Sequence, residues 1–342
     1  MQTTLLKAYL DECRQLILDE IQEIIPHNRY RPILYDLVLE YPLRLGKAFR
    51  PSLCIATCLA LGGRLQDVLR TAAVLELYHN AFLIHDDLED GSLMRRGSPT
   101  LHEDYGVPIA VNVGDATFAL CLHPLLENMQ RIGMGKSLRV LETIARMARE
   151  SVEGQAIELD WVRHGRWQLR DRDYALMAYK KTCWYTFITP MLLGGIVVGL
   201  PPQRLAVLRK YGAYVGLAFQ IQDDVLNLIA DEGRYGKEIG GDLWEGKHTL
   251  ILLHMIRSLS PVERREAHAI LEIPRPEKTA DDVAILYDYI QRYGSIAYAQ
   301  EVAGRLARKA IAVFERSADW IPPSQHRDFL LSMAEYVITR DK

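Results

Sequence analysis

Polar side chains with the spacing i, i+1 and i+4 occur twice in this chain, each time at the end of an apolar helical run. They are Asp86, Asp87 and Asp90 in HDDLED, and Asp223, Asp224 and Asn227 in QDDVLN. On a helix, the first and last members of such a motif lie one turn apart on one face. Two helix ends of this kind that faced each other would form an all-oxygen site suited to Mg²⁺, which binds few carboxylates together with water and phosphate oxygens.

Clustered carboxylates need a compensating charge. Two like charges 4 Å apart repel by about 4 kcal/mol at an effective dielectric constant near 20, and the C-terminal end of a helix is itself negative. The sequence offers two sources of positive charge, which are the pair Arg95 and Arg96 or a bound metal ion. Acidic runs at helix ends are usually only solvated, so the repetition of the motif is what favours a site.

Isolated cations precede helices or occupy turns elsewhere in the chain. Lys47 and Arg50 in GKAFRP come just before a predicted helix N-terminus, which favours an anion. Lys181, in KKT, leads into an apolar helix, and Lys237 and Lys247 lie in a Gly-rich loop that also contains Asp242. For each lysine or arginine the alternative is a solvated surface cation, and for His79, one to two turns below the carboxylates, it is a core histidine.

This inventory indicates chemistry on a diphosphate. The chain has no Cys/His metal cluster, no GxSxG motif and no Walker-type loop. Carboxylates with Mg²⁺ and separate cations suit a substrate whose C–O bond to a diphosphate breaks, because they stabilise the charge that develops on the leaving oxygens. The apolar interior of a helical bundle would hold the hydrocarbon part of such a substrate.

The composition excludes several other classes. A net charge of −3 gives no electrostatic case for nucleic-acid binding. The five cysteines have neither metal-ligand spacing nor a disulfide pattern, which suits a reducing compartment and a cytoplasmic location. We expect no secretory leader, no stretch of about 18 uncharged apolar residues that would span a bilayer, and therefore a soluble protein without stable membrane insertion.

The apolar pattern predicts an all-α fold. Apolar residues recur at i, i+3, i+4 and i+7 almost throughout, and Pro and Gly residues separate the helical segments. One long helix is predicted over Arg64–Glu89, and one bent core helix over Thr182–Leu200. No linker or low-complexity stretch divides the chain, so we expect a single all-α domain over residues 1–342.

Five segments together resemble the trans-isoprenyl diphosphate synthases (the polyprenyl synthetase family), and most of all the geranylgeranyl diphosphate synthases. In chain order they are GKAFRP, LIHDDLEDGSLMRRGSPTLH, KKT, FQIQDDVLN and GKEIGGDLWEGKHTL. The resemblance implies a bundle of ten or more helices around a central apolar cavity, usually as a homodimer. It implies a prenyltransferase that condenses isopentenyl diphosphate with an allylic prenyl diphosphate, head to tail, with up to three Mg²⁺ ions.

The resemblance also implies roles for individual residues. Asp86, Asp90 and Asp223 would bind the Mg²⁺ ions, with Asp87, Asp224 and Asp242 close by. The allylic diphosphate would contact Arg95, Lys181 and Lys237, and isopentenyl diphosphate would contact Lys47, Arg50, His79 and Arg96. The allylic cation would be stabilised by Lys181, Thr182 and Gln220, and Lys247 would help to close the loop.

Two features of the sequence bear on activity and product length. Asn227 stands where most of the family has Asp, but its amide still offers an oxygen, so we expect activity to be retained. Tyr78, Ala81 and Phe82 would form the floor that the growing chain meets. Each added isoprene unit buries five carbons, worth roughly 4 kcal/mol at about 0.8 kcal/mol per methylene, so elongation continues until the floor stops it. We expect a C20 product, with C15 as the next choice and longer chains third.

Two other functions are weighed against this one. A class I terpene cyclase would share metal-dependent ionisation but would not need the second diphosphate pocket formed by Lys47, Arg50, His79 and Arg96. A non-catalytic regulatory subunit should have lost several aspartates or lysines, whereas only Asn227 departs from the pattern. Both functions are therefore less favoured than a synthase.

Overall fold

The computed structural model describes residues 2–44, 46–229 and 240–339. The secondary structure in these ranges is helical, as predicted, apart from a short hairpin in which Met94–Arg95 pairs with Ser98–Pro99. The residues group into two compact units, called unit 1 and unit 2. A single domain over residues 1–342 stays a prediction.

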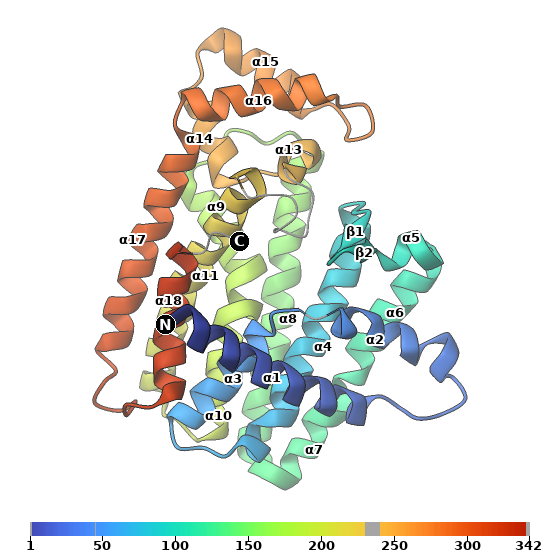
Figure 1. Ribbon diagram of the computed structural model, residues 1–342, viewed down its shortest axis with the longest axis vertical. Coiled ribbons are helices and arrows are strands. Elements are labelled where there is room, and N and C mark those ends of the chain that lie inside the picture. The colour runs from blue at the N-terminus through green and yellow to red at the C-terminus, as the bar shows by residue number, and fades with distance from the viewer. Residues whose placement is uncertain (1, 45, 230–239, 340–342) are drawn as a thin grey trace. The chain divides into compact units, whose positions relative to one another are not determined.

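Unit 1 comprises Met1–Ala148, Tyr185–Gly212 and Ile311–Met333. The elements that lie wholly within it (Figure 1) are α1 (Gln2–Ile24), η1 (Arg31–Ile33), α2 (Tyr35–Leu43), α3 (Phe49–Ala60), α4 (Leu65–Glu89), β1 (Met94–Arg95), β2 (Ser98–Pro99), α5 (Leu101–Tyr105), α6 (Val107–Leu120), α7 (Leu122–Ile132) and α10 (Thr189–Val197).

Helix α4 is the element against which much of unit 1 packs. It contacts α1, α3, α6 and α7, and Figure 1 shows α6 beside it. It starts after the Gly62-Gly63 turn, as the predicted helix over Arg64–Glu89 does, and ends before Gly91, whose φ of +61° suits glycine. Leu77 of α4 and Leu53 of α3 are fully buried in this core. The carboxylates of the first motif therefore stand at the end of a firmly packed helix.

Unit 2 comprises Arg149–Trp184, Ala213–Ala310 and Ala334–Lys342. The elements that lie wholly within it are α9 (Asp171–Ala178), α13 (Gly241–Glu245), α14 (Leu250–Ser258), α15 (Pro261–Leu271) and α16 (Ala280–Arg292). The elements with residues in both units are α8 (Met134–Arg163), η2 (Tyr179–Ile188), α11 (Pro202–Ile229), α17 (Ser295–Glu315) and α18 (Gln325–Thr339).

The segment predicted as one bent helix over Thr182–Leu200 is divided differently in the structure. A π-helix, η2, runs from Tyr179 to Ile188, and α10 follows it with Pro190 in its first turn. Proline lacks an N–H and is tolerated best at that position, so Pro190 begins a helix instead of bending one. π-Helical turns are rare and frequently occur at functional sites, and this one contains Lys181 and Thr182.

The start of α3 also differs slightly from the prediction. The helix begins at Phe49, so Arg50 lies within its first turn and only Lys47 precedes it. The difference arises because Ala48, which precedes the helix, adopts a left-handed conformation with φ +52° and sets the boundary there. Both cations still belong to the N-terminal end of the helix.

One helical stretch bears on the expectation that no segment of the chain spans a bilayer. Residues Val107–Ile132, covering α6 and α7, are long and apolar enough to cross a membrane, with 39% of the most apolar window buried. The stretch contains Asp115, Glu127 and Arg131, so it has no run of about 18 uncharged residues, in line with the expectation from sequence. A core helix of a soluble protein passes the same test.

Candidate active site

The carboxylates at the end of α4 in unit 1 have two different environments. Asp86 and Asp90 are half-buried, and Asp90 is the C-terminal capping residue, its N–H donating to the carbonyl oxygen of Asp86 at 2.9 Å. Asp87 is buried, with a side chain only 1% exposed. The spacing of the motif therefore separates two carboxylates that reach the surface of unit 1 from one that does not.

Asp87 is held by two side chains. The hydroxyl of Tyr41 donates to Oδ2 of Asp87 at 2.6 Å, and Nε of Arg95 donates to Oδ1 at 2.8 Å. Burial lowers the pKa of Arg95, but the hydrogen bond and negative charge of Asp87 outweigh that effect and raise it. Both carboxylate oxygens are thus engaged, so Asp87 anchors Tyr41 and Arg95. Its predicted place close to a metal ion stays a prediction.

The second arginine of the pair faces other partners in unit 1. Arg96 has φ +54°, and its Nη1 donates to the main-chain carbonyl oxygen of Tyr41 at 3.0 Å. A Cβ added at Gly46 would lie 2.5 Å from its Nη2, so the guanidinium packs directly against this glycine and would have to shift for a larger residue. Burial lowers the pKa of Arg96, and the charge of Glu76 opposes that shift.

Arg50 of α3 lies close to Arg96 and Glu76 in unit 1. Its Nη2 donates to Oγ1 of Thr186 at 2.8 Å, and its guanidinium lies over the ring of Tyr185, 4.3 Å from the centroid. Glu76, which is 6% exposed, is close enough to both Arg50 and Arg96 for their charges to counter the rise in its pKa that burial causes. Unit 1 therefore brings together two of the four residues predicted to bind isopentenyl diphosphate, with one buried acid between them.

The other two members of that set lie nearby in the fold of unit 1. The ring of His79 is buried and lies 6.0 Å from that of Tyr185, whose ring also contacts the guanidinium of Arg50. Lys47 is exposed, and its Nζ is 6.0 Å from the ring centroid of Phe49. A contact between these side chains and a substrate stays a prediction.

An aromatic cluster lies one to two turns below Asp86 in unit 1. The ring centroids of Tyr78 and Phe82 are each 5.3 Å from that of Phe118 on α6, and Phe82 is 5.6 Å from Tyr185. Burial raises the pKa of Tyr78 to about 12. Tyr78 and Phe82 thus take part in one cluster, as a floor requires, whereas Ala81 is fully buried and its role stays a prediction.

In unit 2, a chain of hydrogen bonds leads to Asp224. Oγ1 of Thr182 donates to Gln220 at 2.7 Å, and Nε2 of Gln220 donates to Oδ1 of Asp224 at 2.8 Å. The hydroxyl of Tyr174 donates to Oδ2 at 2.7 Å. Burial raises the pKa of Asp224, and the charges of Asp242 and Asp223 raise it further. Thr182 and Gln220, both predicted to stabilise an allylic cation, are therefore joined to the second acidic motif.

Asn227 links the second motif to α13. Its Oδ1 accepts a hydrogen bond from the N–H of Asp242 at 3.2 Å, and its carbonyl oxygen accepts one from the N–H of Gly240 at 2.7 Å. The residue is 6% exposed. The amide oxygen that was expected to replace a carboxylate thus holds the start of the helix that carries Asp242.

The lysines predicted to act on substrate are already paired in unit 2. Nζ of Lys181 forms a close ion pair with Oε2 of Glu158, and Nζ of Lys247 lies 2.7 Å from Oε2 of Glu245. A Cβ added at Gly154 would lie 2.2 Å from the main-chain nitrogen of Lys181, so glycine there allows α8 to approach the π-helix. Lys237 lies outside the described residues.

The donor set fits magnesium. Within residues 2–44, 46–229 and 240–339, no group of three or more His, Cys, Asp or Glu is placed to hold a metal ion by itself. Mg²⁺ binds through one or two carboxylates and takes its remaining ligands from water and substrate phosphates. Asp86 and Asp90 can supply those carboxylates. In unit 2, the mutual repulsion of Asp223, Asp224 and Asp242 would be relieved by a cation.

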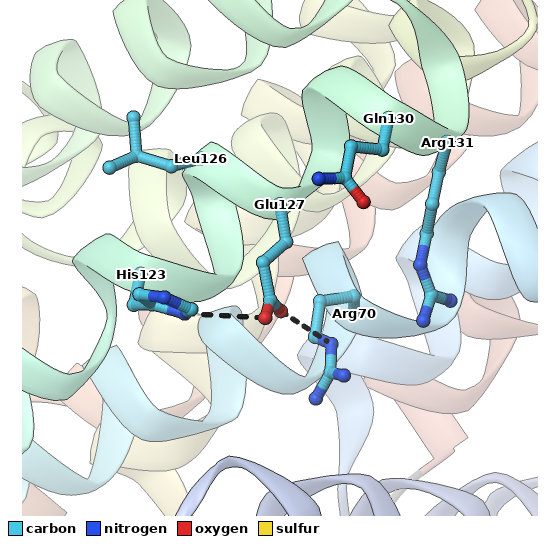
Figure 2. Close-up of a pocket in the computed structure, with 6 residues that line it drawn as sticks. All are labelled: Arg70, His123, Leu126, Glu127, Gln130 and Arg131. Atoms are coloured by element: carbon cyan, nitrogen blue, oxygen red, sulfur yellow. Dashed lines mark ion pairs between the residues drawn. The ribbon is translucent and has the colours of Figure 1, made fainter.

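A surface pocket of about 380 Å³ occurs elsewhere in unit 1 (Figure 2). Within it, Glu127 lies 3.4 Å from Nε of Arg70 and 3.3 Å from Nδ1 of His123. None of the predicted site residues lines it; its lining consists of Arg70, His123, Leu126, Glu127, Gln130 and Arg131. The pocket is therefore separate from the residues that carry the chemistry.

Several residues that shape these clusters were not predicted from the sequence. They are Tyr41, Glu76, Phe118, Glu158, Tyr174 and Tyr185. Glu76 alone carried a signal, as an acid inside the apolar run that precedes His79. The others are aromatic or acidic residues whose partners are distant along the chain.

Helix ends with clustered carboxylates, together with arginines and lysines that are held by acids, fit a helical enzyme that acts on phosphorylated substrates. The chain belongs to the polyprenyl synthetase family, whose model matches residues 32–290. It is accordingly a prenyltransferase.

Individual relatives agree with this assignment. A short chain isoprenyl diphosphate synthase of Methanothermobacter thermautotrophicus is 32% identical over 98% of each chain. The crystal structure of a geranylgeranyl pyrophosphate synthetase from Pyrococcus horikoshii matches with a TM-score of 0.88 at 33% identity, covering 99% of this chain and 100% of that one. A polyprenyl synthase from Caulobacter crescentus, crystallised with calcium and isoprenyl diphosphate, matches with a TM-score of 0.84 at 28% identity, covering 100% and 97%.

Proposed function

We propose that this protein is a Mg²⁺-dependent synthase that condenses isopentenyl diphosphate with an allylic prenyl diphosphate and releases a trans C20 product, geranylgeranyl diphosphate. The observation that carries the proposal is the arrangement in unit 1 of two half-buried carboxylates above an aromatic cluster, beside separately anchored arginines. The similarity to a geranylgeranyl pyrophosphate synthetase supports the product length.

The allylic diphosphate is assigned to the acidic motifs. Asp86 and Asp90 of unit 1 and Asp223 of unit 2 would hold up to three Mg²⁺ ions, which supply positive charge to the diphosphate oxygens when bound. Asp224 and Asp242 add negative charge near Asp223. Arg95, Lys181 and Lys237 would contact the same diphosphate. The ammonium group of Lys181 would then bind both Glu158 and the diphosphate. Because Glu158 already holds it, the group is in position before substrate binds.

Isopentenyl diphosphate is assigned to Arg50, Arg96, His79 and Lys47. Arg50 and Arg96 both lie near Glu76 in unit 1, so the repulsion between the two guanidinium groups is compensated before substrate binds. Arginine recognises phosphate through several N–H donors in fixed geometry. These side chains would therefore bind the diphosphate of isopentenyl diphosphate without a metal ion.

The reaction has three steps. The allylic C–O bond breaks, and the diphosphate leaves with the bonding electrons. The π electrons of isopentenyl diphosphate then form the new C–C bond to the allylic cation. Finally a proton is lost from the adjacent carbon to restore a double bond, and the released diphosphate accepts it. The oxygens of Thr182 and Gln220, in the hydrogen-bonded chain to Asp224, stabilise the cation.

Product length is assigned to the aromatic cluster. Tyr78 lies eight residues before Asp86, about 12 Å along a helix that rises 1.5 Å per residue. Tyr78, Phe82 and Phe118 contact one another at this depth and would stop the growing chain. The C15 product is the next choice, because Phe82 lies closer to the carboxylates than Tyr78 does.

We further propose a cytoplasmic homodimer without membrane insertion. All five cysteines are buried and free, which suits a reducing compartment. The face of α6 and α7 exposes large apolar side chains, among them Val107, Leu122 and Leu126, each more than half exposed. A second copy on this face would cover them, and Leu122→Glu should then convert a dimer into a monomer in size-exclusion chromatography with light scattering.

Product analysis tests the proposed function. The purified protein with Mg²⁺ and isopentenyl diphosphate is supplied with dimethylallyl, geranyl or farnesyl diphosphate, and the products are dephosphorylated and separated. We expect geranylgeraniol as the longest main product from every primer that reacts. A main product of C15, or of C25 and longer, would refute the C20 assignment, and no product from any primer would refute the synthase.

A further inference from the structure

Tyr41 lies outside every motif that points to function, yet it contacts the networks of both consecutive arginines. It is located in α2 (Tyr35–Leu43) and is 1% exposed. Its hydroxyl donates to Oδ2 of Asp87 at 2.6 Å, and Asp87 holds Arg95. Its main-chain carbonyl oxygen accepts a hydrogen bond from Nη1 of Arg96 at 3.0 Å. One residue is therefore joined to Arg95 through its side chain and to Arg96 through its backbone.

The carbonyl oxygen of Tyr41 lies in the last turn of α2, where it accepts a long hydrogen bond from the N–H of Arg44 at 3.3 Å. Its second lone pair is left for Arg96. Helix α2 ends at Leu43, and the carbonyls of a last turn lack full intrahelical partners. Such carbonyls also carry the negative end of the helix dipole, which favours a cation. The guanidinium of Arg96 thus meets an acceptor that the helix itself does not fully use.

The two arginines diverge although they are neighbours in sequence. Arg96 has φ +54°, so its side chain turns towards Gly46 and Glu76, while Arg95 turns to Asp87. Arg95 is thereby paired with Asp87, whereas Arg96 shares the charge of Glu76 with Arg50. Tyr41 links both arginines: its hydroxyl binds Asp87, which holds Arg95, and its main-chain carbonyl oxygen binds Arg96. These two connections are called the arms of Tyr41.

We infer that Tyr41 is a positioning residue that sets the separation of Arg95 and Arg96, and hence the orientation of the two diphosphates relative to each other. The inference rests on the proposed function, in which Arg95 contacts the allylic diphosphate and Arg96 contacts isopentenyl diphosphate. It makes an asymmetric prediction. Loss of the hydroxyl removes the arm to Asp87 and Arg95, together with the hydrogen bond that the hydroxyl accepts from the N–H of Leu101 at 3.4 Å. The backbone arm to Arg96 remains.

Tyr41→Phe tests this asymmetry. A hydrogen bond to a charged group is worth roughly tenfold or more in affinity, so we expect the KM for the allylic diphosphate to rise about tenfold. The KM for isopentenyl diphosphate should stay within about twofold. If Tyr41 had only a structural role, Tyr41→Phe would raise both KM values alike or neither. Either result would overturn the inference.

Tyr211→Phe is the matched control. Tyr211 is also fully buried in unit 1, and its hydroxyl donates to the carbonyl oxygen of Leu330, far from either arginine in the chain. Both variants lose one buried tyrosine hydroxyl, so both should lower Tm. Only Tyr41→Phe should change the ratio of the two KM values, and the same change in Tyr211→Phe would contradict the inference.

A binding measurement separates this inference from the proposed function. Inorganic diphosphate with Mg²⁺ should raise the Tm of the wild-type protein and of Tyr211→Phe equally, and that of Tyr41→Phe less. An equal rise in all three proteins, or no rise in any, would overturn the positioning role even if the enzyme is active. If the rises differ as expected but no prenyl product forms, the positioning role stands and the proposed reaction fails.

Discussion

Asp87 and Arg95 lie eight residues apart and form a buried ion pair, in which Nε of Arg95 donates to Oδ1 of Asp87 at 2.8 Å. The middle carboxylate of the first acidic motif therefore holds an arginine. Asp86 and Asp90, on either side of it in sequence, are half-buried at the end of α4. Three carboxylates in one short motif thus have separable roles.

Substitutions of Asp86 and Asp87 should have opposite signatures. Asp87→Asn leaves the buried guanidinium without its counter-charge, so we expect a loss of about 3 kcal/mol in the free energy of unfolding. Asp86→Asn removes a metal ligand from a half-buried site, so we expect little change in stability and a fall of about 100-fold or more in kcat. Denaturant unfolding and steady-state rates measure the two effects. Equal loss of stability in both variants would contradict this division of roles.

Phe118 should limit the length of the product. Its ring lies 5.3 Å from those of both Tyr78 and Phe82, so Phe118→Leu opens the cluster from the side of α6. We expect the main product to lengthen by at least one isoprene unit, because each added unit buries apolar surface until sterics forbid it. Reversed-phase chromatography of the dephosphorylated products measures this.

The control for Phe118 is Phe314→Leu. Phe314 is 1% exposed in unit 1 and packs against Tyr211 instead of the cluster. The Phe314→Leu variant should be less stable than the wild type but should make a product of the same chain length. An unchanged product in Phe118→Leu would show that this residue is not part of the floor.

Asn227→Asp should alter the requirement for magnesium. The carboxylate keeps an acceptor for the N–H of Asp242 but adds a fourth acid near Asp223, Asp224 and Asp242. We expect a lower Tm without metal, because like charges repel, and a fall of about fivefold in the Mg²⁺ concentration that gives half-maximal activity. An unchanged Mg²⁺ dependence would place residue 227 outside the metal site.

The stability of the protein should fall in mild acid because of His248. The ring is 1% exposed and stacked on Trp167 at 3.8 Å, and burial lowers its pKa to about 4. The unfolded chain, with a histidine pKa near 6.5, takes up the proton first. The contribution of the buried, neutral His248 to the free energy of unfolding is therefore fully present above pH 6.5. It is lost as the pH falls towards 4, and about 2 kcal/mol is lost by pH 5.

Thermal unfolding between pH 7 and pH 5 measures this loss. His248→Phe keeps an aromatic ring against Trp167 and cannot titrate, so its Tm should fall less than that of the wild type. His123→Gln is the control, because the side chain of His123 is 81% exposed. The same fall in wild type and His248→Phe would show that His248 is not the titrating group.

The fold could be predicted from sequence wherever local pattern decides. The apolar period and the Gly62-Gly63 break predict α4 to within one residue. The π-helix over Tyr179–Ile188 could not be predicted, because it depends on contacts such as the approach of Gly154 to Lys181. The pairing of Arg95 with Asp87 likewise depends on a turn that brings the chain back to its own helix.

The site could be predicted only in part. Spacing identified the carboxylates, since a helix fixes which of them share a face. The arginines were identified by the need for a compensating charge, by their place before a helix and by the resemblance to the family. Tyr41, Phe118 and Tyr174 have apolar rings that read as core residues, and only their partners across unit 1 or unit 2 reveal a role. That Asp86 and Asp223 act on one substrate stays a prediction, because each is described within its own unit.

A double-mutant cycle on the initial rate of prenyl transfer tests that central claim most directly. Wild type, Asp86→Asn, Asp223→Asn and the double variant are compared with isopentenyl diphosphate, farnesyl diphosphate and saturating Mg²⁺. We expect wild type to make geranylgeranyl diphosphate, each single variant to be at least about 100-fold slower, and the double variant to be far less impaired than the product of the two effects. Wild-type activity in either single variant, or effects that simply multiply, would contradict a magnesium site shared by the two acidic motifs.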